Sequence, residues 1–223
     1  MTASEQKVYE RSRTHIRYRL KNNAIVPGVT TFTGTLDKPA MTEKANQLGL
    51  QGIESRKYWK SLAEIGSLVH LMILADLHGE DPSTCTAIEA KPMVDLAENC
   101  FLSYLSWKAG KVIEPILLEH PLVSEMFKFG GTLDFYGRID HVLTLADFKT
   151  GAAIYDEHWY QLASLSVLLA EAGYESPKSF TIINIPRAET DSFDTKTRAG
   201  LSIEWQISKK LLEIYYLRKE QSK

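Results

Sequence analysis

Residues 131 to 151 read Gly131-Thr-Leu-Asp-Phe-Tyr-Gly-Arg-Ile-Asp-His-Val-Leu-Thr-Leu-Ala-Asp-Phe-Lys-Thr-Gly151, two apolar runs separated by Asp140-His141. Each run has the length and composition of a β-strand. Aspartate tolerates turn conformations and can bond its own backbone, so Asp140-His141 is the expected two-residue turn of a hairpin. With that turn, Asp134 lies directly opposite Asp147.

Directly opposed strand residues share one face, with Cβ atoms about 4.5–5.5 Å apart. Two carboxylates at that separation repel each other unless a positive charge lies between them. Lys149 is two residues beyond Asp147 and therefore on the same face. The simplest solution is a divalent cation held by Asp134 and Asp147, with Lys149 beside it.

Two alternatives stay open at this stage. A bulge, or a loop longer by one residue, would turn Asp134 to the other face, whereas a shift of two residues would keep both acids together. The acid-x-lysine spacing also recurs, in Glu5-Gln-Lys7, Glu89-Ala-Lys91 and Asp194-Thr-Lys196. Only Asp147-Phe-Lys149 ends an apolar strand behind a second acid. The plain alternative is a surface ion pair worth about 0–1 kcal/mol.

Composition limits the classes of protein. The 223 residues allow one sizeable domain or two small ones. Two cysteines, Cys85 and Cys100, support neither a disulfide framework nor a four-cysteine metal site. No signal-peptide pattern or membrane-spanning apolar run is apparent, so we expect a cytoplasmic protein. The net charge is -2, yet basic residues crowd both ends of the chain, among them Arg17, Arg19 and Lys21. Such a local strip can hold phosphates.

Apolar periodicity and turn residues predict the remaining elements. A hairpin spans residues 15–26, and helices are expected over 39–48, 54–77, 93–108, 156–172 and 201–218, with strands over 111–119, 126–129 and 179–185. A strand, a helix and a strand in succession make a crossover, so the strand ending at Lys149 should run parallel to the one containing Ile183. We expect a single domain, an α/β core over 111–223 with a mainly helical part over 1–110.

Two further residues are ambiguous on pattern alone. His70 lies at the edge of the apolar stripe of the long helix, with Gly66 one turn before it, and a lone helical histidine is more often a packing residue than a ligand. Gln161 lies on the helix after the Asp147 strand. It is either a surface amide or a partner for Lys149 or a phosphate.

Taken together, these residues resemble the PD-(D/E)XK nuclease superfamily, in its RecB-like and phage-type exonuclease branch. The motifs are Gly131-Thr-Leu-Asp134, Asp147-Phe-Lys149-Thr-Gly151, Gln161 and Gly66-Ser-Leu-Val-His70. Val26-Pro-Gly-Val-Thr-Thr31 and Lys38-Pro-Ala resemble the front end of such phage proteins. The motifs cover about half of the chain, in the order typical of that superfamily.

The resemblance implies a restriction-endonuclease-like mixed β-sheet core with flanking helices. His70, Asp134, Asp147 and the backbone carbonyl of Phe148 would bind Mg²⁺ or Mn²⁺. Lys149 would orient and activate the attacking water or stabilise the pentavalent phosphorus, and Gln161 would position that lysine or the backbone. Leu165 stands where a tyrosine often follows the glutamine, and an aromatic residue could come from Tyr155 or Tyr160 instead. Relatives with an iron–sulfur cluster need four cysteines, so no cluster is expected.

The leading hypothesis is therefore a metal-dependent DNA exonuclease. It would cut from free, single-stranded ends in recombination, repair or viral genome processing, as a cytoplasmic or phage protein working beside a separate helicase or recombinase. We expect DNA contacts from Arg17, Arg19, Lys21, Thr30, Thr31, Tyr155 and Tyr160. Three alternatives remain: a structure-specific endonuclease, a non-catalytic DNA-binding protein with a relict nuclease fold, and a nucleotide phosphohydrolase.

Overall fold

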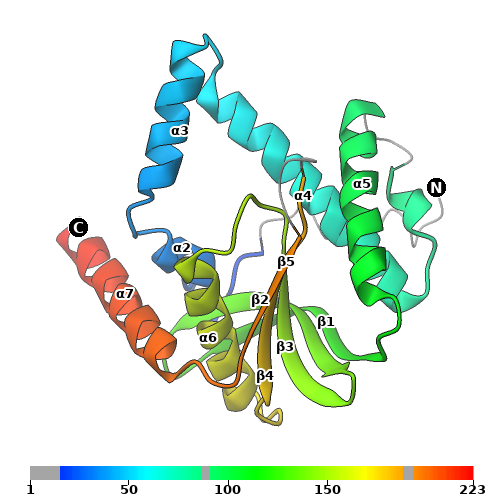
Figure 1. The fold of residues 1–223 in the computed structure, drawn as a ribbon. Helices are drawn as coiled ribbons and strands as arrows, with labels where there is room; N and C mark the ends of the chain where they lie inside the picture. Colours follow the sequence, from blue (N-terminus) through cyan, green and yellow to red (C-terminus); the bar gives the residue numbers. More distant parts are fainter. Residues whose placement is uncertain (1–15, 87–90, 188–192, 223) are drawn as a thin grey trace. The chain divides into compact units, whose positions relative to one another are not determined.

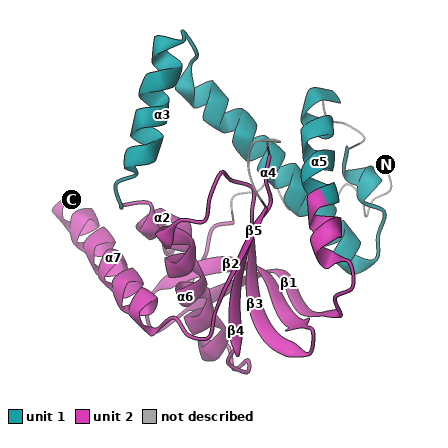
Figure 2. Ribbon diagram, in the orientation of Figure 1, with its two compact units in different colours: residues 1–14, 36–102 teal, residues 15–35, 103–223 magenta. Residues whose placement is uncertain are grey.

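The computed structural model describes residues 16–86, 91–187 and 193–222. These fall into two compact units, one over residues 36–102 and the other combining residues 15–35 with 103–223 (Figure 2). The expected site residues of the Asp147 hairpin all belong to the second unit. A single functional domain stays a prediction.

The first unit is helical (Figure 1). It contains α3 (Pro39–Leu50), α4 (Ser55–His78), the short 3₁₀-helix η1 (Pro82–Thr86) and the first part of α5 (Lys91–Lys108). Pro39 begins α3, a position where its missing N–H costs nothing. Gly79 ends α4 in the left-handed conformation, with φ of 73°. The three predicted helices of this region are confirmed to within two residues at each end.

Helix α4 corrects one sequence-based expectation. By length and composition it could cross a membrane, although no such apolar run was expected. About 39% of its most apolar window is buried within the structure. Core helices of soluble proteins commonly meet the same criterion.

The second unit is built on a five-stranded mixed sheet. Its strands are β1 (Ile113–Ser124), β2 (Phe129–Ile139), β3 (Val142–Lys149), β4 (Ser179–Asn184) and β5 (Asp194–Arg198), adjacent in that order. Only the β3–β4 pair is parallel, as the crossover predicted. The fold class, an α/β protein with a mixed sheet and flanking helices, is thereby confirmed.

One strand prediction, over residues 126–129, was wrong, and one strand was missed. Residues 125–128 form the turn between β1 and β2, because β1 extends to Ser124 and β2 begins at Phe129. Strand β5 was missed because its sequence, Asp-Thr-Lys-Thr-Arg, has no apolar residue to mark it. Residues 194–198 are identified as a strand only by their backbone pairing with β4.

Three helices of the second unit pack together beside the sheet: α2 (Val29–Thr33), α6 (Asp156–Glu171) and α7 (Ser202–Gln221). Leu162, Leu165, Leu168 and Leu169 of α6 are almost fully buried. The hydroxyl of Ser208 on α7 donates a hydrogen bond of 2.9 Å to the carbonyl of Tyr160 on α6. The short helix α2 was not predicted from the sequence.

The N-terminal segment is attached to β2 through a close packing contact. Gly28 pairs with Gly130, and the Tyr18 ring lies where a Cβ atom on Gly130 would be. The Tyr18 hydroxyl and the Thr132 hydroxyl are 2.9 Å apart. Burial is the main reason that the pKa of Tyr18 is raised. A glycine at position 130 is therefore required for this segment to reach the sheet.

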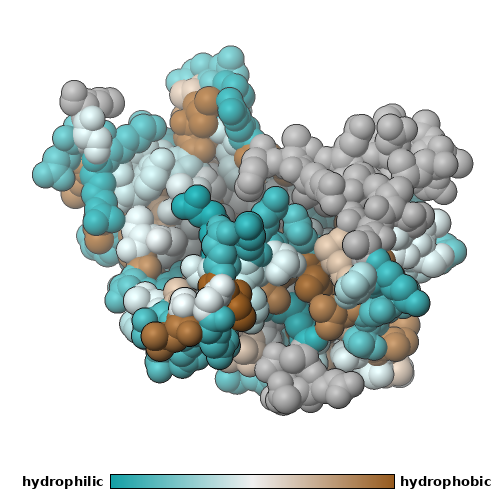
Figure 3. All heavy atoms as spheres, turned by 90° about the horizontal axis from the view of Figure 1, so that it is seen from above, coloured by the Kyte–Doolittle hydropathy of each residue, from teal (hydrophilic) through white to brown (hydrophobic). Residues whose placement is uncertain are grey.

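Exposed apolar side chains are scattered rather than gathered on the face that Figure 3 shows, where brown residues form several small groups among hydrophilic ones. The most exposed large examples are Leu50, at 82%, and Met126, at 72%. Scattered apolar residues of this kind are normal on protein surfaces.

Candidate metal centre

The β2–β3 hairpin has the predicted geometry. Asp140 and His141 are its two turn residues, with φ of 49° and 68°, the left-handed values that a type I′ turn requires. Ile139 pairs with Val142, and the same register continues to Phe135 opposite Ala146. Extended by one step, this register places Asp134 opposite Asp147. The predicted turn and the register as far as Phe135 and Ala146 are confirmed.

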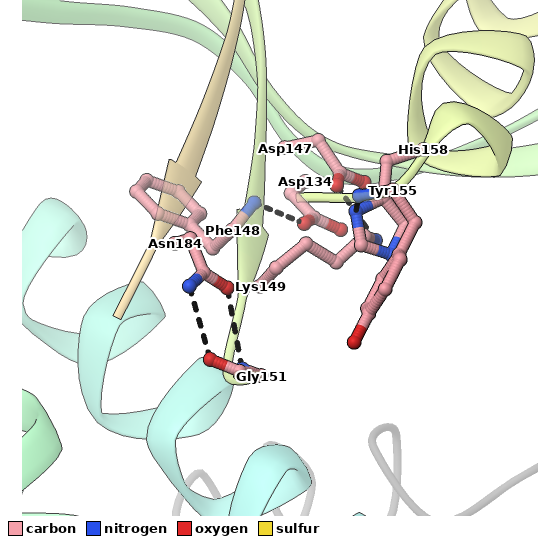
Figure 4. Close-up of polar contacts among 8 residues, drawn as sticks. All are labelled: Asp134, Asp147, Phe148, Lys149, Gly151, Tyr155, His158 and Asn184. Atoms are coloured by element: carbon pink, nitrogen blue, oxygen red, sulfur yellow. Dashed lines mark hydrogen bonds and ion pairs between the residues drawn. The ribbon is translucent and has the colours of Figure 1, made fainter. Parts of the chain in front are cut away.

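Regular pairing between β2 and β3 stops one residue before the two acids. Beyond that point the backbone N–H of Phe148 donates a hydrogen bond of 2.9 Å to Oδ2 of Asp134. A carboxylate therefore takes the place that a backbone carbonyl would have in a continued ladder. Figure 4 shows Asp134, Asp147 and Lys149 on one side of β3 and the Phe148 ring on the other.

Asp147 is fully buried, and its surroundings raise the pKa of its carboxyl group. Burial is the largest cause, and the negative charge of Asp134 adds to it. The Lys149 ammonium, with Nζ 2.6 Å from Oδ2, opposes this effect. Within the described residues, Oδ1 has no hydrogen-bond partner, and the contact of Oδ2 is the ion pair with Lys149.

Lys149 is held in its charged form. Burial alone would lower the pKa of its ammonium group, but Asp147, Asp134 and Glu119 outweigh burial and raise it. Its side chain as a whole keeps 21% exposure. The centre therefore contains a fixed cation beside an excess of carboxylates.

These donors fit a magnesium or manganese ion. Both metals prefer oxygen ligands and commonly bind through one or two carboxylates. A buried carboxylate oxygen without a hydrogen bond normally has an ion or a water as its partner. Asp134, Asp147 and the carbonyl of Phe148 could together provide such ligands.

Asn184, at the end of β4, fixes the segment after Lys149. Its fully buried side chain donates a hydrogen bond of 3.0 Å to the carbonyl of Gly151 and accepts one of 3.3 Å from the N–H of Gly151. The N–H of Ile185 also donates to the Lys149 carbonyl at 2.7 Å. The sequence analysis missed this residue, although an asparagine ending so apolar a strand must find partners.

His158 was also missed. It lies on the first turn of α6, its Nδ1 accepts a hydrogen bond of 3.3 Å from the N–H of Tyr155, and its ring is 5.7 Å from the Tyr155 ring. His158 lowers the pKa of Asp147, which places it near that carboxylate (Figure 4). A histidine one turn before Gln161 was the available signal.

The remaining predicted residues lie in several places. Gln161 is half-buried on α6, and its side-chain amide has no hydrogen-bond partner among the described residues. Tyr160 is half-buried on the same helix. His70 is half-buried on α4, in the first unit, so the second unit taken by itself does not contain it. The other predicted DNA contacts are exposed: Arg17, Arg19, Lys21, Thr30, Thr31 and Tyr155.

Leu165 packs over the backbone of Gly131. A Cβ atom on Gly131 would lie 2.7 Å from Cδ2 of Leu165 and 3.0 Å from Cγ2 of Val29. Leu165 thus fills the space over the bare backbone of Gly131, inside the core. A tyrosine at position 165 would meet that same backbone.

No family model and no curated protein matches this chain. Solved structures that resemble it include SSO0001, at 14% identity over 94% of this chain and 81% of that one, with a TM-score of 0.40. A second resembling structure is of a protein from Eubacterium rectale that is described as an exonuclease. It has 10% identity to this chain, the match covers 69% of this chain and 65% of that one, and the TM-score is 0.46. The alkaline exonuclease LHK-Exo of Laribacter hongkongensis has 15% identity to this chain. The match covers 75% of this chain and 86% of that one, with a TM-score of 0.33. At these values the likenesses identify neither a family nor an activity.

Proposed function

We propose that this protein is a metal-dependent DNA nuclease, and more narrowly an exonuclease that hydrolyses phosphodiester bonds from free ends. The observation that carries the proposal is the buried carboxylate of Asp147, with an oxygen left without a hydrogen bond between Asp134 and Lys149. A buried carboxylate oxygen without a hydrogen bond is costly, so a fold retains it where a cation completes the site.

Asp134, Asp147 and the Phe148 carbonyl would hold the cation, and His70 is a proposed further ligand on the resemblance alone. When bound there, Mg²⁺ or Mn²⁺ would make a water more acidic and would offset negative charge on the phosphate oxygens. The Lys149 ammonium donates to the attacking water or to a phosphate oxygen. Gln161 is proposed to position that lysine.

DNA would approach through exposed groups of the second unit. Arg17, Arg19 and Lys21 provide positive charge for the phosphates, and Thr30 and Thr31 provide hydroxyl donors. Tyr155 and Tyr160 offer rings on which bases can stack. We further propose single-stranded ends as substrate, and a role beside a helicase or recombinase in repair, recombination or phage replication within the cytoplasm.

Degradation of end-labelled linear DNA, single- and double-stranded, in Mg²⁺ and in Mn²⁺ tests the proposal. Loss of linear DNA, with circular single strands intact and EDTA inhibitory, is the expected result. Lys149→Ala should abolish cleavage. Lys196→Ala is the matched control, because Asp194 and Lys196 have the same spacing in an exposed pair 3.4 Å apart. That variant should retain full activity.

Two results would redirect the assignment. Cleavage of circular single strands would indicate the structure-specific endonuclease. Salt-sensitive DNA binding without cleavage in either metal would contradict the enzyme and leave the DNA-binding protein with a relict nuclease fold.

A further inference from the structure

Glu119 lies opposite Asp134 across the β1–β2 pair. The neighbouring pairs are Leu118 with Phe135 and His120 with Leu133, so Glu119 and Asp134 are the residues between them. Carboxylate oxygens of the two side chains lie within 4.8 Å of each other. Glu119 is also one of the charges that raise the pKa of Lys149. It therefore belongs to the same local group of charges.

The backbone at Glu119 is unusual for a strand. Its φ is 43°, whereas the other non-glycine residues with positive φ, Asn23, Lys128, Asp140 and His141, lie in turns or directly beside them. A left-handed residue interrupts the alternation of side chains along a strand. Because of this conformation, the side-chain direction of Glu119 cannot be deduced by counting residues along β1.

Asp134, Asp147 and Glu119 bring three carboxylates around the ammonium of Lys149. Carboxylate oxygens are the ligands that Mg²⁺ and Mn²⁺ prefer in proteins. An independent observation also points to a ligand, because Asp147 is fully buried and its Oδ1 has no hydrogen-bond partner among the described residues.

We infer that Glu119 is a further carboxylate ligand of the divalent cation held by Asp134 and Asp147. The inference rests on the metal centre of the proposed function. It assigns to β1 a ligand that the hairpin and its motif do not contain. Strand β1, which is separated from β3 by β2, would then also contribute to metal binding.

Direct binding of Mn²⁺ to the full chain, measured by calorimetry without DNA, tests this assignment. Glu119→Gln should weaken Mn²⁺ binding by about tenfold or more. Glu114→Gln is the matched control, an exposed glutamate of the same strand opposite Arg138, and should bind like wild type. Unchanged Mn²⁺ affinity in Glu119→Gln would overturn the inference.

A second variant guards against a folding defect. Glu119→Gly removes the carboxylate and favours the positive φ, so its far-ultraviolet circular dichroism should match wild type while its Mn²⁺ binding is weakened equally. Wild-type affinity in this variant would also overturn the inference.

The same measurements separate this inference from the nuclease proposal. If wild type binds Mn²⁺ through Glu119 but cuts no DNA, the inference stands and the nuclease proposal fails. If wild type cuts DNA and Glu119→Gln binds Mn²⁺ normally, the nuclease proposal stands and the inference fails.

Discussion

The carboxylate of Asp134 accepts a hydrogen bond of 2.9 Å from the backbone N–H of Phe148, at the point where β2 and β3 cease to pair. One carboxylate thus accepts the hydrogen bond that ends the sheet ladder and is also a ligand of the proposed metal centre. The structural role needs only an acceptor oxygen, whereas metal binding needs the negative charge. The two roles can therefore be separated by substitution.

Two substitutions of Asp134 should affect protein stability and metal binding differently. Asp134→Asn keeps an acceptor for the Phe148 N–H, so unfolding in urea should be nearly unchanged while Mn²⁺ binding is lost. Asp134→Ala leaves that N–H without its partner and should lower the free energy of unfolding by about 1–3 kcal/mol. Equal destabilisation by both variants would contradict the structural role of the hydrogen bond.

Asp147→Asn should stabilise the protein in EDTA. The variant removes a buried charge that repels Asp134 and lacks a hydrogen bond at Oδ1. Because a raised pKa means that the ionised Asp147 carboxylate opposes folding at pH 8, we expect the free energy of unfolding to rise, while Mn²⁺ binding and cleavage disappear. A less stable variant in urea titrations would show that Lys149 already compensates the charge of Asp147.

Metal stabilisation should depend on pH. The pKa of Asp147 is raised above its ordinary value of 3.8, so the metal-free folded protein holds a proton that the unfolded chain has lost. Its stability therefore falls as pH rises from about 4 through the raised pKa. Mn²⁺ needs the ionised carboxylate, so the thermal shift that Mn²⁺ causes should be smaller at pH 5 than at pH 8.

The control for this pH dependence is Asp147→Asn, which lacks the titrating group. Its melting temperature in EDTA should lose the pH dependence that Asp147 causes. A thermal shift by Mn²⁺ of equal size at pH 5 and pH 8 in wild type would count against a raised pKa at Asp147.

Gly131→Ala tests the packing behind the metal centre. Its new methyl group would meet Leu165 at 2.7 Å and Val29 at 3.0 Å, so thermal or urea unfolding should show a loss of about 1–3 kcal/mol. Gly49→Ala, in helix α3, meets nothing within 4 Å and should be neutral or more stable by up to about 1 kcal/mol. Equal stability of the two variants would refute the packing argument.

Asn184→Leu should slow catalysis because it disturbs the position of the segment that follows Lys149, although Asn184 itself takes no part in the reaction. It leaves both polar groups of the Gly151 backbone unpaired, two residues from Lys149, at a cost of about 1–3 kcal/mol in stability. We expect kcat to fall while Mn²⁺ binding is retained. Asn184→Asp keeps one of the two hydrogen bonds and should be intermediate, and an unaffected kcat in Asn184→Leu would exclude a positioning role.

The sequence by itself determined the elements whose signals are local. Alternating apolar residues and the Asp140-His141 turn set the register that brings Asp134 opposite Asp147, and the strand–helix–strand order made β3 and β4 parallel. Only the tertiary structure decided which distant residues join them. Glu119 depends on a left-handed backbone residue within β1, and Asn184 depends on a contact with Gly151 across 33 positions. Local periodicity encodes strands and turns, whereas contacts between distant segments depend on how the whole chain packs.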